Sequence, residues 1–189
     1  MNICVFAGSS PGKREAYKLA ARQLGEELAS RNIGLVYGGA SVGLMGAVAD
    51  GALAKGGAAI GVIPSSLADV EIAHTELDEL LIVPTMHERK AQMAESADAF
   101  IALPGGIGTL EESFEVWTWS QLGIHKKPLG LLNVEGYFDG LNTFLDHIVA
   151  EGFVKEEHRG IMVSAAEPGS LIDQLLEVDV PQTRKWAEV

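Results

Sequence analysis

The sequence predicts an α/β protein, a Rossmann-like doubly wound parallel sheet with helices on both faces. Short apolar segments alternate along the chain with longer segments whose apolar residues recur at helical spacing. Most of the short segments are almost entirely apolar, which is typical of parallel strands covered on both faces. Three of them run into glycine-bearing loops, the kind of turn that joins a strand to a helix beside a ligand.

Six strands and six helices are expected from this alternation. The strands are expected at 2–7, 34–37, 58–63, 79–83, 99–103 and 129–133. The helices are expected at 13–30, 43–54, 86–94, 109–122, 137–151 and 170–176. Residues 65–77 show no clear period, so a short helix and an ordered loop are equally open there.

The length and composition are those of one compact domain. The chain has 189 residues, of which 47% are hydrophobic and 21% are charged, an ordinary balance for a globular protein. Since there is no internal repeat or linker, a single Rossmann-like domain is expected over residues 1–180. Residues 181–189 begin with Pro181, carry mixed charges, and are expected to form a peripheral tail.

The composition also disfavours several locations and partners. No apolar run approaches the roughly 18 residues that span a membrane, and the short run 3–7 indicates a buried strand rather than a signal peptide. Because Cys4 is the single cysteine, no intramolecular disulfide can form, and the cytoplasm is the expected location. The net charge of −12 argues against nucleic acid or an anionic membrane as a partner. One small anion can still bind to backbone amides.

The three glycine-bearing loops, at 8–12, 38–43 and 105–108, do not match a cofactor fingerprint. The third has Glu111 where the last glycine of the dinucleotide motif would stand, and the first has Arg14 where a Walker A loop needs Ser or Thr. We therefore expect no cofactor. A tight turn would explain any one loop, but three at one sheet edge favour a cradle for phosphate or ribose.

The first loop also satisfies the pattern G-x-S-x-G, with Ser10 at its centre. A serine hydrolase would need an acid and then a histidine further along the chain, and Asp146 and His158 are candidates. The pattern is short and occurs often by chance. We favour a turn in which Gly8, Ser9 and Ser10 face a ligand.

A helix is expected to begin at Thr109, directly after the third loop. Thr109 and Glu112 have the spacing of a capping box, in which each side chain accepts a hydrogen bond from the other residue's amide. Together with Glu111 and Glu115, Glu112 places more carboxylate in the first two turns than a cap needs. Glu112 is therefore interpreted either as a cap or as a catalyst, and the amides at this helix start suit an anion.

A second capping box, from Thr85 to Glu88, is followed by Arg89 and Lys90. Cations near a helix N-terminus oppose the macrodipole, an unfavourable contribution of about 0.3–1 kcal/mol each at exposed sites. Neither cation has an acidic residue three or four positions away along the helix. Such departures from local preference tend to mark functional sites, so we expect both cations to face a ligand anion or Glu112.

A carboxylate and a cation beside a phosphorylated ribose suit the hydrolysis of an N-glycosidic bond. Cleavage passes through an oxocarbenium-like sugar, which a carboxylate stabilises while it activates water. An arginine can orient that carboxylate and hold the sugar hydroxyls or the phosphate. The five histidines are scattered and show no ligand spacing, so no metal is expected.

The residues at these two helix starts resemble one family. Met86-His-Glu-Arg-Lys-Ala91 and Pro104-Gly-Gly-Ile-Gly-Thr-Leu-Glu-Glu112 are similar to motifs of the LONELY GUY family, the cytokinin riboside 5′-monophosphate phosphoribohydrolases. The resemblance covers residues 2–165. It implies a Rossmann-like homodimer that acts on a nucleoside 5′-monophosphate and releases a free N6-substituted adenine and ribose 5-phosphate. Whether AMP is also a substrate is left open.

The resemblance casts Arg89 and Glu112 as the catalytic pair, with the phosphate held by Gly106, Gly108 and Thr109. The full set of substrate-binding residues that it implies is Gly8, Ser9, Gly38, Gly39, Glu71, Met86, Lys90, Gly105, Gly106, Ile107, Gly108, Thr109, Leu110, Glu111 and Thr118. Ile107 stands where many relatives carry tyrosine, and the flanks of Glu71 differ from the family pattern.

Two other functions are weighed against this one. Relatives have often been labelled lysine decarboxylases, but a pyridoxal-phosphate enzyme needs a Schiff-base lysine and a partner for the pyridine nitrogen. Lys90, beside Arg89 and a capping box, is interpreted instead as a partner for phosphate or carboxylate. A protein of this fold could also carry a nucleotide or a pterin-like cofactor without turnover.

Overall fold

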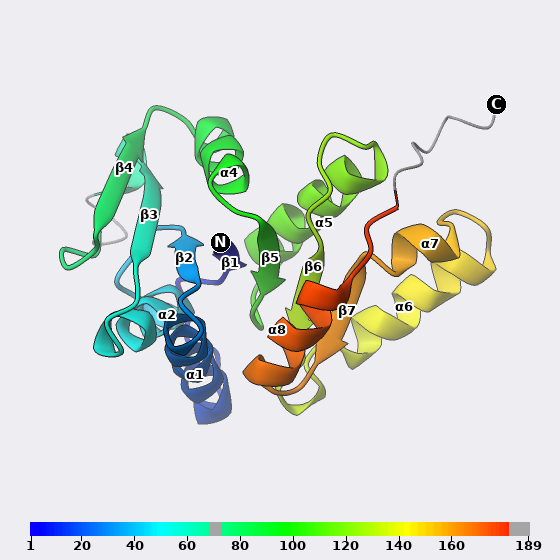
Figure 1. The fold of residues 1–189 in the computed structure, drawn as a ribbon, viewed down its shortest axis with the longest axis horizontal. Helices are drawn as coiled ribbons and strands as arrows, with labels where there is room; N and C mark the ends of the chain where they lie inside the picture. Colours follow the sequence, from blue (N-terminus) through cyan, green and yellow to red (C-terminus); the bar gives the residue numbers. More distant parts are fainter. Residues whose placement is uncertain (69–72, 182–189) are drawn as a thin grey trace.

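The computed structural model describes residues 1–68 and 73–181 of the chain. Within these ranges, seven parallel strands form one sheet in the order β4-β3-β2-β1-β5-β6-β7. The strands are β1 (Asn2–Phe6), β2 (Gly34–Tyr37), β3 (Ala59–Pro64), β4 (Glu79–Val83), β5 (Ala99–Ala102), β6 (Leu129–Leu132) and β7 (Met162–Ala165). This sheet and the helices around it confirm the predicted Rossmann-like α/β class (Figure 1).

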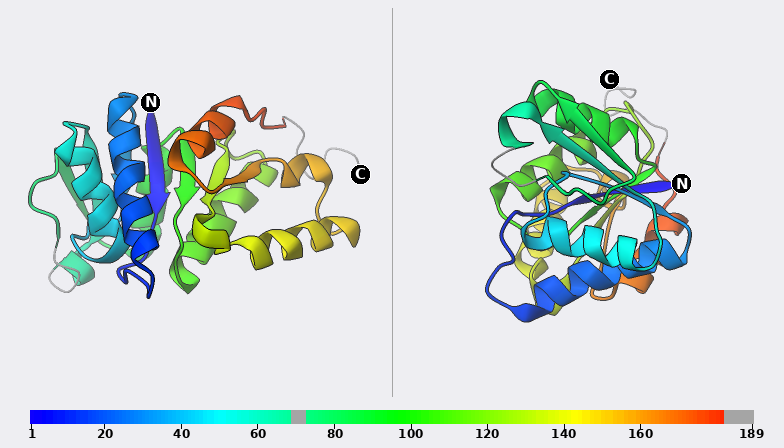
Figure 2. Two further views of the ribbon diagram at one scale, coloured as in Figure 1. Left: turned by 90° about the horizontal axis from the view of Figure 1, so that it is seen from below. Right: turned by 90° about the vertical axis from the view of Figure 1, so that its left-hand side faces the viewer.

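Helices cover both faces of the sheet (Figure 2). One face carries α1 (Glu15–Ser30), α2 (Gly43–Ala54) and α8 (Pro168–Glu177). The other face carries α4 (Met86–Glu95), α5 (Ile107–Gln121) and α6 (Asp139–Ala150). The shorter connecting helices are α3 (Ser65–Ala68), the 3-10 helix η1 (Val134–Gly136) and α7 (Glu156–Arg159).

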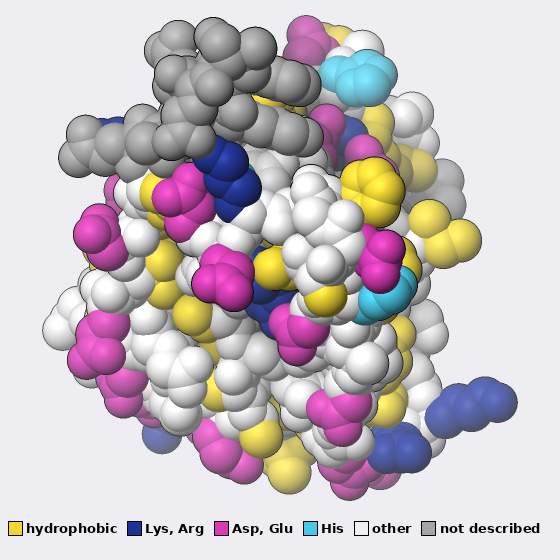
Figure 3. All heavy atoms as spheres, turned by 90° about the vertical axis from the view of Figure 1, so that its right-hand side faces the viewer, with side chains coloured by type: hydrophobic (Ala, Val, Ile, Leu, Met, Phe, Trp, Pro, Cys, Tyr) yellow, Lys and Arg dark blue, Asp and Glu magenta, His cyan; other side chains and the backbone are white. Residues whose placement is uncertain are grey.

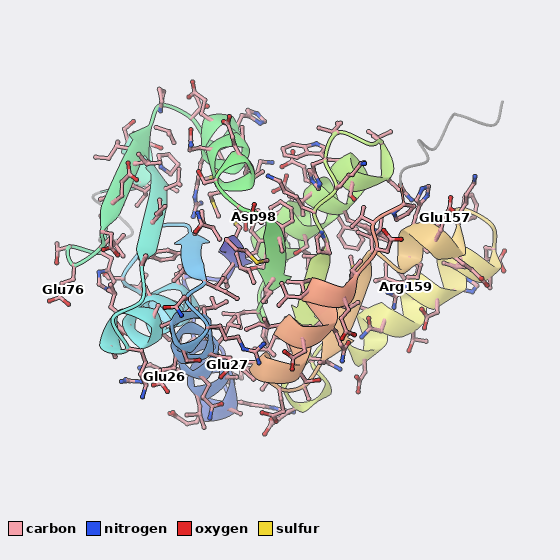
Figure 4. The ribbon with its side chains drawn as sticks, in the orientation of Figure 1. Glu26, Glu27, Glu76, Asp98, Glu157 and Arg159 are labelled. Carbon is pink, nitrogen blue, oxygen red and sulfur yellow. The ribbon has the colours of Figure 1, made fainter. Side chains whose placement is uncertain are left out.

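The central strands are almost entirely apolar because both of their faces are buried. In β1, Ile3 and Val5 pack into the core beneath α1, α2 and α8, whereas Cys4 and Phe6 pack into the core beneath α4, α5 and α6. Successive side chains of a strand point to opposite faces, so two separate cores require an unbroken apolar run. At the amino ends of β1 and β5, the Asp98 carboxylate (Figure 4) accepts a hydrogen bond from the Asn2 amide at 2.8 Å.

Most element boundaries agree with the sequence expectations to within two residues, but β7 and α7 were not predicted. β7 has only four residues, Met162–Ala165, including a serine, and lies at the edge of the sheet beside β6. A strand this short gives almost no period, and an edge strand needs no continuous apolar run. The open region 65–77 contains α3, while residues 69–72 lie outside the described ranges.

The order of the strands creates a switch point between β1 and β5. From β1 the chain proceeds outward through β2 and β3 to β4, then returns to place β5 on the other side of β1. Ligands of open α/β sheets bind at the carboxyl ends of the strands beside such a point. The loops that follow β1 and β5 begin at Ala7 and Leu103, and they carry the first and third glycine-bearing loops to this edge.

No helix among the described residues is long and apolar enough to cross a membrane. Figure 3 shows acidic side chains over much of the face that contains α6 and α7, in keeping with the net charge of −12. The tail expected at 181–189 lies, apart from Pro181, outside the described residues. A single domain over residues 1–180 stays a prediction.

Candidate active site

A crevice of about 400 Å³ opens at the carboxyl edge of the sheet, beside the switch point. Its walls come from the loop after β1, the start of α2, the first turns of α4 and the start of α5. Ten of the expected site residues line it: Gly8, Ser9, Met86, Arg89, Lys90, Gly106, Gly108, Thr109, Glu111 and Glu112. Residues distant in sequence therefore meet at one place, while their individual roles stay predictions.

Arg89 and Lys90 reach the crevice because α4 begins with the predicted capping box. The Thr85 hydroxyl oxygen accepts from the Glu88 amide at 3.2 Å, and Glu88 Oε2 accepts from the Thr85 amide at 3.0 Å. The box satisfies two amides at the helix start and sets where the first turn begins. Arg89 and Lys90 follow directly after it, in the first two turns of α4.

The Arg89 side chain is buried, with only 6% of its surface exposed, and it is held by backbone oxygens. Its Nε donates to the carbonyl of Val62 at 3.1 Å, and its Nη2 donates to the carbonyl of Gly38 at 3.2 Å. Nη1 lies 3.5 Å from the Met86 sulfur. No carboxylate of a described residue forms an ion pair with this guanidinium, so a buried positive charge faces the crevice without an anion.

Gly38 does not line the crevice; it makes room for the guanidinium. A Cβ atom at this position would come within 1.9 Å of Arg89 Nη2 and 2.8 Å of the Met45 sulfur. The second glycine-bearing loop therefore serves the site through Arg89. Gly39, the next residue, adopts a φ of 77° and its carbonyl accepts from the His74 amide at 2.9 Å.

Glu112 faces the same crevice from α5 in a largely buried position. Burial raises the pKa of Glu112 to about 7, against the opposing effect of the Arg89 charge. The negative charge of Glu111 adds to the rise, and Lys90 opposes it. A carboxyl that titrates near neutral pH is suited to exchange protons with water or a sugar hydroxyl.

Lys90 is paired with acids from the neighbouring helix. Its Nζ lies 2.5 Å from Glu111 Oε1 and 3.0 Å from Glu115 Oε2. Burial lowers the pKa of Lys90, but hydrogen bonds to these two carboxylates outweigh it and leave the pKa raised. The sequence correctly showed no partner on α4 itself. A carboxylate partner for Lys90 was expected, but the acids that pair with it are Glu111 and Glu115 of α5 rather than Glu112.

The capping box predicted from Thr109 to Glu112 is not formed. α5 begins at Ile107 with Gly106 as its N-cap and no side-chain cap, and Leu110 donates to the Gly106 carbonyl at 3.2 Å. Thr109 is therefore already helical, whereas a cap needs an extended backbone. The glycines let the helix start two residues earlier than the capping pattern suggests, so Glu112 points into the crevice instead of back to Thr109.

The early start of α5 leaves an open helix end at the crevice. The amides of Ile107 and Gly108 precede the first intrahelical hydrogen bond, and both residues are exposed. Thr109 is buried, and its side chain packs against the backbone of Gly105. A Cβ atom at position 105 would come within 2.3 Å of Thr109 Oγ1, so this contact requires glycine. A helix start of this kind binds anions through its free amides and its dipole.

Five other expected residues lie outside the crevice lining: Gly39, Gly105, Ile107, Leu110 and Thr118. Ile107 points to solvent with 88% of its surface exposed, and Leu110 packs against the core beneath α5. The Thr118 hydroxyl donates to the Phe114 carbonyl at 2.7 Å within α5. The carbonyl of Gly105 accepts from the Tyr137 hydroxyl at 2.6 Å. Glu71 lies outside the described residues.

Ser10 lines the crevice with Gly8 and Ser9, in the loop that was expected to face a ligand, whereas Met45 and Ala7 line it without having been expected. Met45 belongs to the first turn of α2, directly after the second glycine-bearing loop, and its sulfur lies 3.9 Å from Arg89 Nη2. Its position in the sequence could have indicated the site, since the second glycine-bearing loop was expected to lie beside the other two at one edge of the sheet. An isolated methionine in an apolar helix nevertheless indicates core packing more strongly than a site.

The serine-hydrolase arrangement is not assembled around Ser10. The Ser10 hydroxyl accepts from the Gly12 amide at 3.3 Å. Asp146 forms an ion pair at 2.9 Å with Arg159, the last residue of α7, which is labelled in Figure 4. His158 is buried on α7, and its carbonyl accepts from the Trp117 indole. In the part of the chain that the structure describes, no cluster of three or more His, Cys, Asp or Glu residues could hold a metal ion.

The fold and the site together define a class: a Rossmann-like protein with a crevice, between an open helix start and a buried arginine, that suits a small anionic ligand. Residues 45–175 match the sequence profile of the family described as "Possible lysine decarboxylase".

The cytokinin riboside 5′-monophosphate phosphoribohydrolase LOG2 of Arabidopsis thaliana is 56% identical over 180 residues, which cover 95% of this chain and 84% of that protein. The probable enzyme of the same name, LOGL9 of Oryza sativa subsp. japonica, is 54% identical over 175 residues, or 93% of this chain and 77% of that protein. The chain therefore belongs to the LONELY GUY family of cytokinin riboside 5′-monophosphate phosphoribohydrolases, as its motifs predicted.

Solved structures of more distant proteins share the fold. The molybdenum cofactor carrier protein of Chlamydomonas reinhardtii superposes with a TM-score of 0.72 at 24% identity, over 94% of this chain and 98% of that chain. DNA processing protein A of Streptococcus pneumoniae superposes with a TM-score of 0.60 at 14% identity, over 92% and 61%. At these identities the likeness shows the fold alone.

Proposed function

We propose that this protein hydrolyses the N-glycosidic bond of cytokinin riboside 5′-monophosphates, releasing an N6-substituted adenine and ribose 5-phosphate. The observation that carries the proposal is that Arg89 and Glu112 line the same crevice. Arg89 is a buried cation without a carboxylate partner among the described residues, and Glu112 is a partly buried carboxyl whose pKa is raised to about 7. The family relationship, at 52–56% identity to named phosphoribohydrolases, supports the same reaction.

The 5′-phosphate would bind at the start of α5. The free amides there, together with the Thr109 side chain, offer donors to a phosphate, and the helix dipole favours its negative charge. The loop after β1 brings Gly8 and Ser9 to the opposite wall. A phosphate held between these two loops places the ribose over Arg89 and Glu112.

Hydrolysis then needs one water molecule and one base. Glu112 in its ionised form accepts a proton from water as the water oxygen bonds to C1′ of the ribose. The electrons of the C1′–N9 bond leave with the purine, which takes up a proton from solvent, and Glu112 then returns its proton to solvent. The developing positive charge of the sugar is stabilised by the Glu112 carboxylate, while Arg89 orients the carboxylate and the ribose hydroxyls.

The base would lie against the methionine side chains of the crevice. Met45 and Met86 are the long apolar residues of its lining, and thioethers pack adaptably against aromatic rings and alkyl groups. This surface suits an adenine with an apolar N6 substituent. AMP, which lacks that substituent, would lose this apolar contact.

We also propose that the enzyme is a cytoplasmic homodimer with no nucleic-acid partner. Exposed apolar side chains support an interface between subunits: Met86 and Ile107 at the starts of α4 and α5, and Ile82 on the edge strand β4. The net charge of −12 supports the absence of a nucleic-acid surface. Light scattering after size-exclusion chromatography should report twice the mass of the 20.1 kDa chain; a monomer across the micromolar range would contradict the dimer.

Chromatography of the reaction products tests the main proposal. Purified protein incubated with isopentenyladenosine 5′-monophosphate should release isopentenyladenine and ribose 5-phosphate in equal amounts. AMP should react more slowly, and isopentenyladenosine without its phosphate should remain intact. Binding of the nucleotide without release of base from either monophosphate would favour a carrier over an enzyme.

A further inference from the structure

The start of α5 holds three carboxylates that differ in their environment. Glu111 and Glu115 are one helical turn apart and face Lys90 of α4, with Nζ-to-oxygen distances of 2.5 and 3.0 Å. Glu112 is the next residue round the helix and lines the crevice. No ion pair joins Glu112 to Lys90, although both line the same crevice. Two acids on one helix therefore hold a cation that could otherwise pair with the third.

Lys90 is mostly buried, so its ammonium needs nearby carboxylates. Only 11% of its side chain is exposed, so its ammonium is partly removed from water and depends on the two carboxylates for compensation. Glu111 and Glu115 are 52% and 27% exposed, so the acids can be changed without opening the core. An ammonium released from them would find Glu112 as the nearest remaining acid of the crevice.

The titratable groups that interact electrostatically with Glu112 come from three elements. α4 contributes Arg89 and Lys90, both of which favour its ionised form, and α5 contributes Glu111 and Glu115, which oppose it. β1 contributes the buried thiol of Cys4, whose own pKa is raised by burial and by Glu112. Arg89 is held by backbone carbonyls, so Lys90 is the cation whose partner can change.

We propose that Glu111 and Glu115 are positioning residues that hold the Lys90 ammonium away from Glu112, which leaves the Glu112 carboxylate unpaired and available to water. This role rests on the proposed function of Glu112 and goes beyond it. If Lys90 paired with Glu112, the carboxylate would be ionised at lower pH but bound to an ammonium and weaker as a base. The clasp formed by Lys90, Glu111 and Glu115 thus sets the pH range in which Glu112 accepts a proton.

Carbon-13 NMR titration of the glutamate side chains tests the clasp without relying on turnover. The Glu112 signal is assigned by its loss in Glu112→Gln, and its pKa is then compared between the parent protein and Glu111→Gln/Glu115→Gln. We expect the pKa of Glu112 to fall by about one unit in the double variant. Glu95→Gln, which removes an exposed carboxylate at the far end of α4, is the matched control and should leave it unchanged.

A second pair of variants separates the role of Lys90 from the simple loss of two charges. Lys90→Met alone should raise the pKa of Glu112, and adding Glu111→Gln/Glu115→Gln to it should lower that pKa by less than in the parent background. An equal fall in both backgrounds, or no fall in either, would overturn the clasp. The variant Glu111→Gln/Glu115→Asp keeps one of the two negative charges, so its Glu112 pKa should recover most of the parent value.

The pH dependence of kcat/KM gives the functional readout. Its acidic limb should move to lower pH in Glu111→Gln/Glu115→Gln, with a reduced plateau, and should stay in place in Glu95→Gln. A parent protein that releases no base would contradict the proposed function but leave the NMR comparison intact. An unmoved Glu112 pKa in an active enzyme would contradict the clasp alone.

Discussion

The guanidinium of Arg89 lies directly against the backbone of Gly38, with Nη2 3.2 Å from the glycine's carbonyl oxygen. This contact joins the carboxyl end of β2 to α4 across the sheet edge, and it holds a charge that has no carboxylate partner within the described ranges. The direction of the guanidinium, and with it the shape of the crevice, depends on residue 38 being a glycine, which has no side chain to occupy that space.

Gly38→Ala should therefore displace Arg89 while the fold is retained. A Cβ atom would come within 1.9 Å of Nη2, so the guanidinium must leave its place between Gly38 and Val62. We expect kcat/KM for isopentenyladenosine 5′-monophosphate to fall at least about 100-fold, because a displaced catalytic group loses its alignment. Gly140→Ala on α6, where a Cβ atom meets nothing within 4 Å, is the matched control. Equal activity of the two variants would contradict the role of Gly38.

The raised pKa of Glu112 also predicts how stability depends on pH. Its folded-state pKa of about 7 exceeds the value of 4.5 expected for an exposed side chain, so the folded protein binds this proton more tightly than the unfolded chain does. The stabilising contribution is complete below pH 4.5 and is lost as pH rises through 7. Glu112→Gln should remove this loss and raise the free energy of unfolding by about 3 kcal/mol at pH 8, with the advantage shrinking toward pH 5.

Urea unfolding of the parent protein and Glu112→Gln at pH 5 and pH 8 measures this effect. A carboxylate retained at the expense of stability is expected of a functional group rather than a structural one. A variant that is less stable than the parent at pH 8 would show that the ionised carboxylate stabilises the fold.

His125 should have the opposite pH dependence. Burial lowers its pKa to about 4, and Lys127 adds to the fall; the ring packs beside Phe100 and Trp119. The unfolded chain therefore binds this proton more tightly, and stability is lost as pH falls from 6.5 toward 4. In the Glu112→Gln background, where the opposing group is absent, the free energy of unfolding should be lower at pH 5 than at pH 8 on account of His125. His125→Phe should flatten this slope; an unchanged slope would assign it to other groups.

The Tyr137 hydroxyl should matter for binding more than for folding. It donates to the Gly105 carbonyl at 2.6 Å, directly before the start of α5, and the ring is partly exposed. Tyr137→Phe keeps the ring contact with Tyr17 and should change the free energy of unfolding by less than about 1 kcal/mol. We expect KM to rise several-fold with kcat nearly unchanged, because the turn that presents the phosphate-binding amides is released. Tyr17→Phe is the control, and equal KM values in the two variants would contradict this role.

The sequence predicted the sheet well because its central strands are buried on both faces. Residues 3–6 and 99–102 are unbroken apolar runs whose alternate side chains enter two different cores, and such runs are visible without any knowledge of the fold. β7 escaped prediction because an edge strand of four residues carries no such pattern. Local chemistry also placed the start of α4 correctly, since the capping box of Thr85 and Glu88 is complete within four residues.

The sequence predicted most of the residues that line the crevice, but not which of them form ion pairs or caps. The glycine-bearing loops and the two helix starts named most of the crevice, because parallel strands bring their carboxyl ends to one edge. The partners of Lys90 lie on another helix, 21 and 25 residues away, so no spacing rule for a single helix could identify them. The true start of α5 was missed because Thr109 and Glu112 imitate a capping box that the preceding glycines make unnecessary.

The central claim, that Glu112 is a catalytic group in a nucleotide-binding crevice, is tested most directly by measuring binding and turnover on one variant. Glu112→Gln should bind AMP, measured by calorimetry, within about three-fold of the parent affinity, because the phosphate contacts come from backbone amides. Release of isopentenyladenine from isopentenyladenosine 5′-monophosphate should fall by about 10²–10⁴-fold, the usual loss when a general base is removed. A Glu112→Gln protein that hydrolyses the nucleotide at the parent rate would contradict the claim.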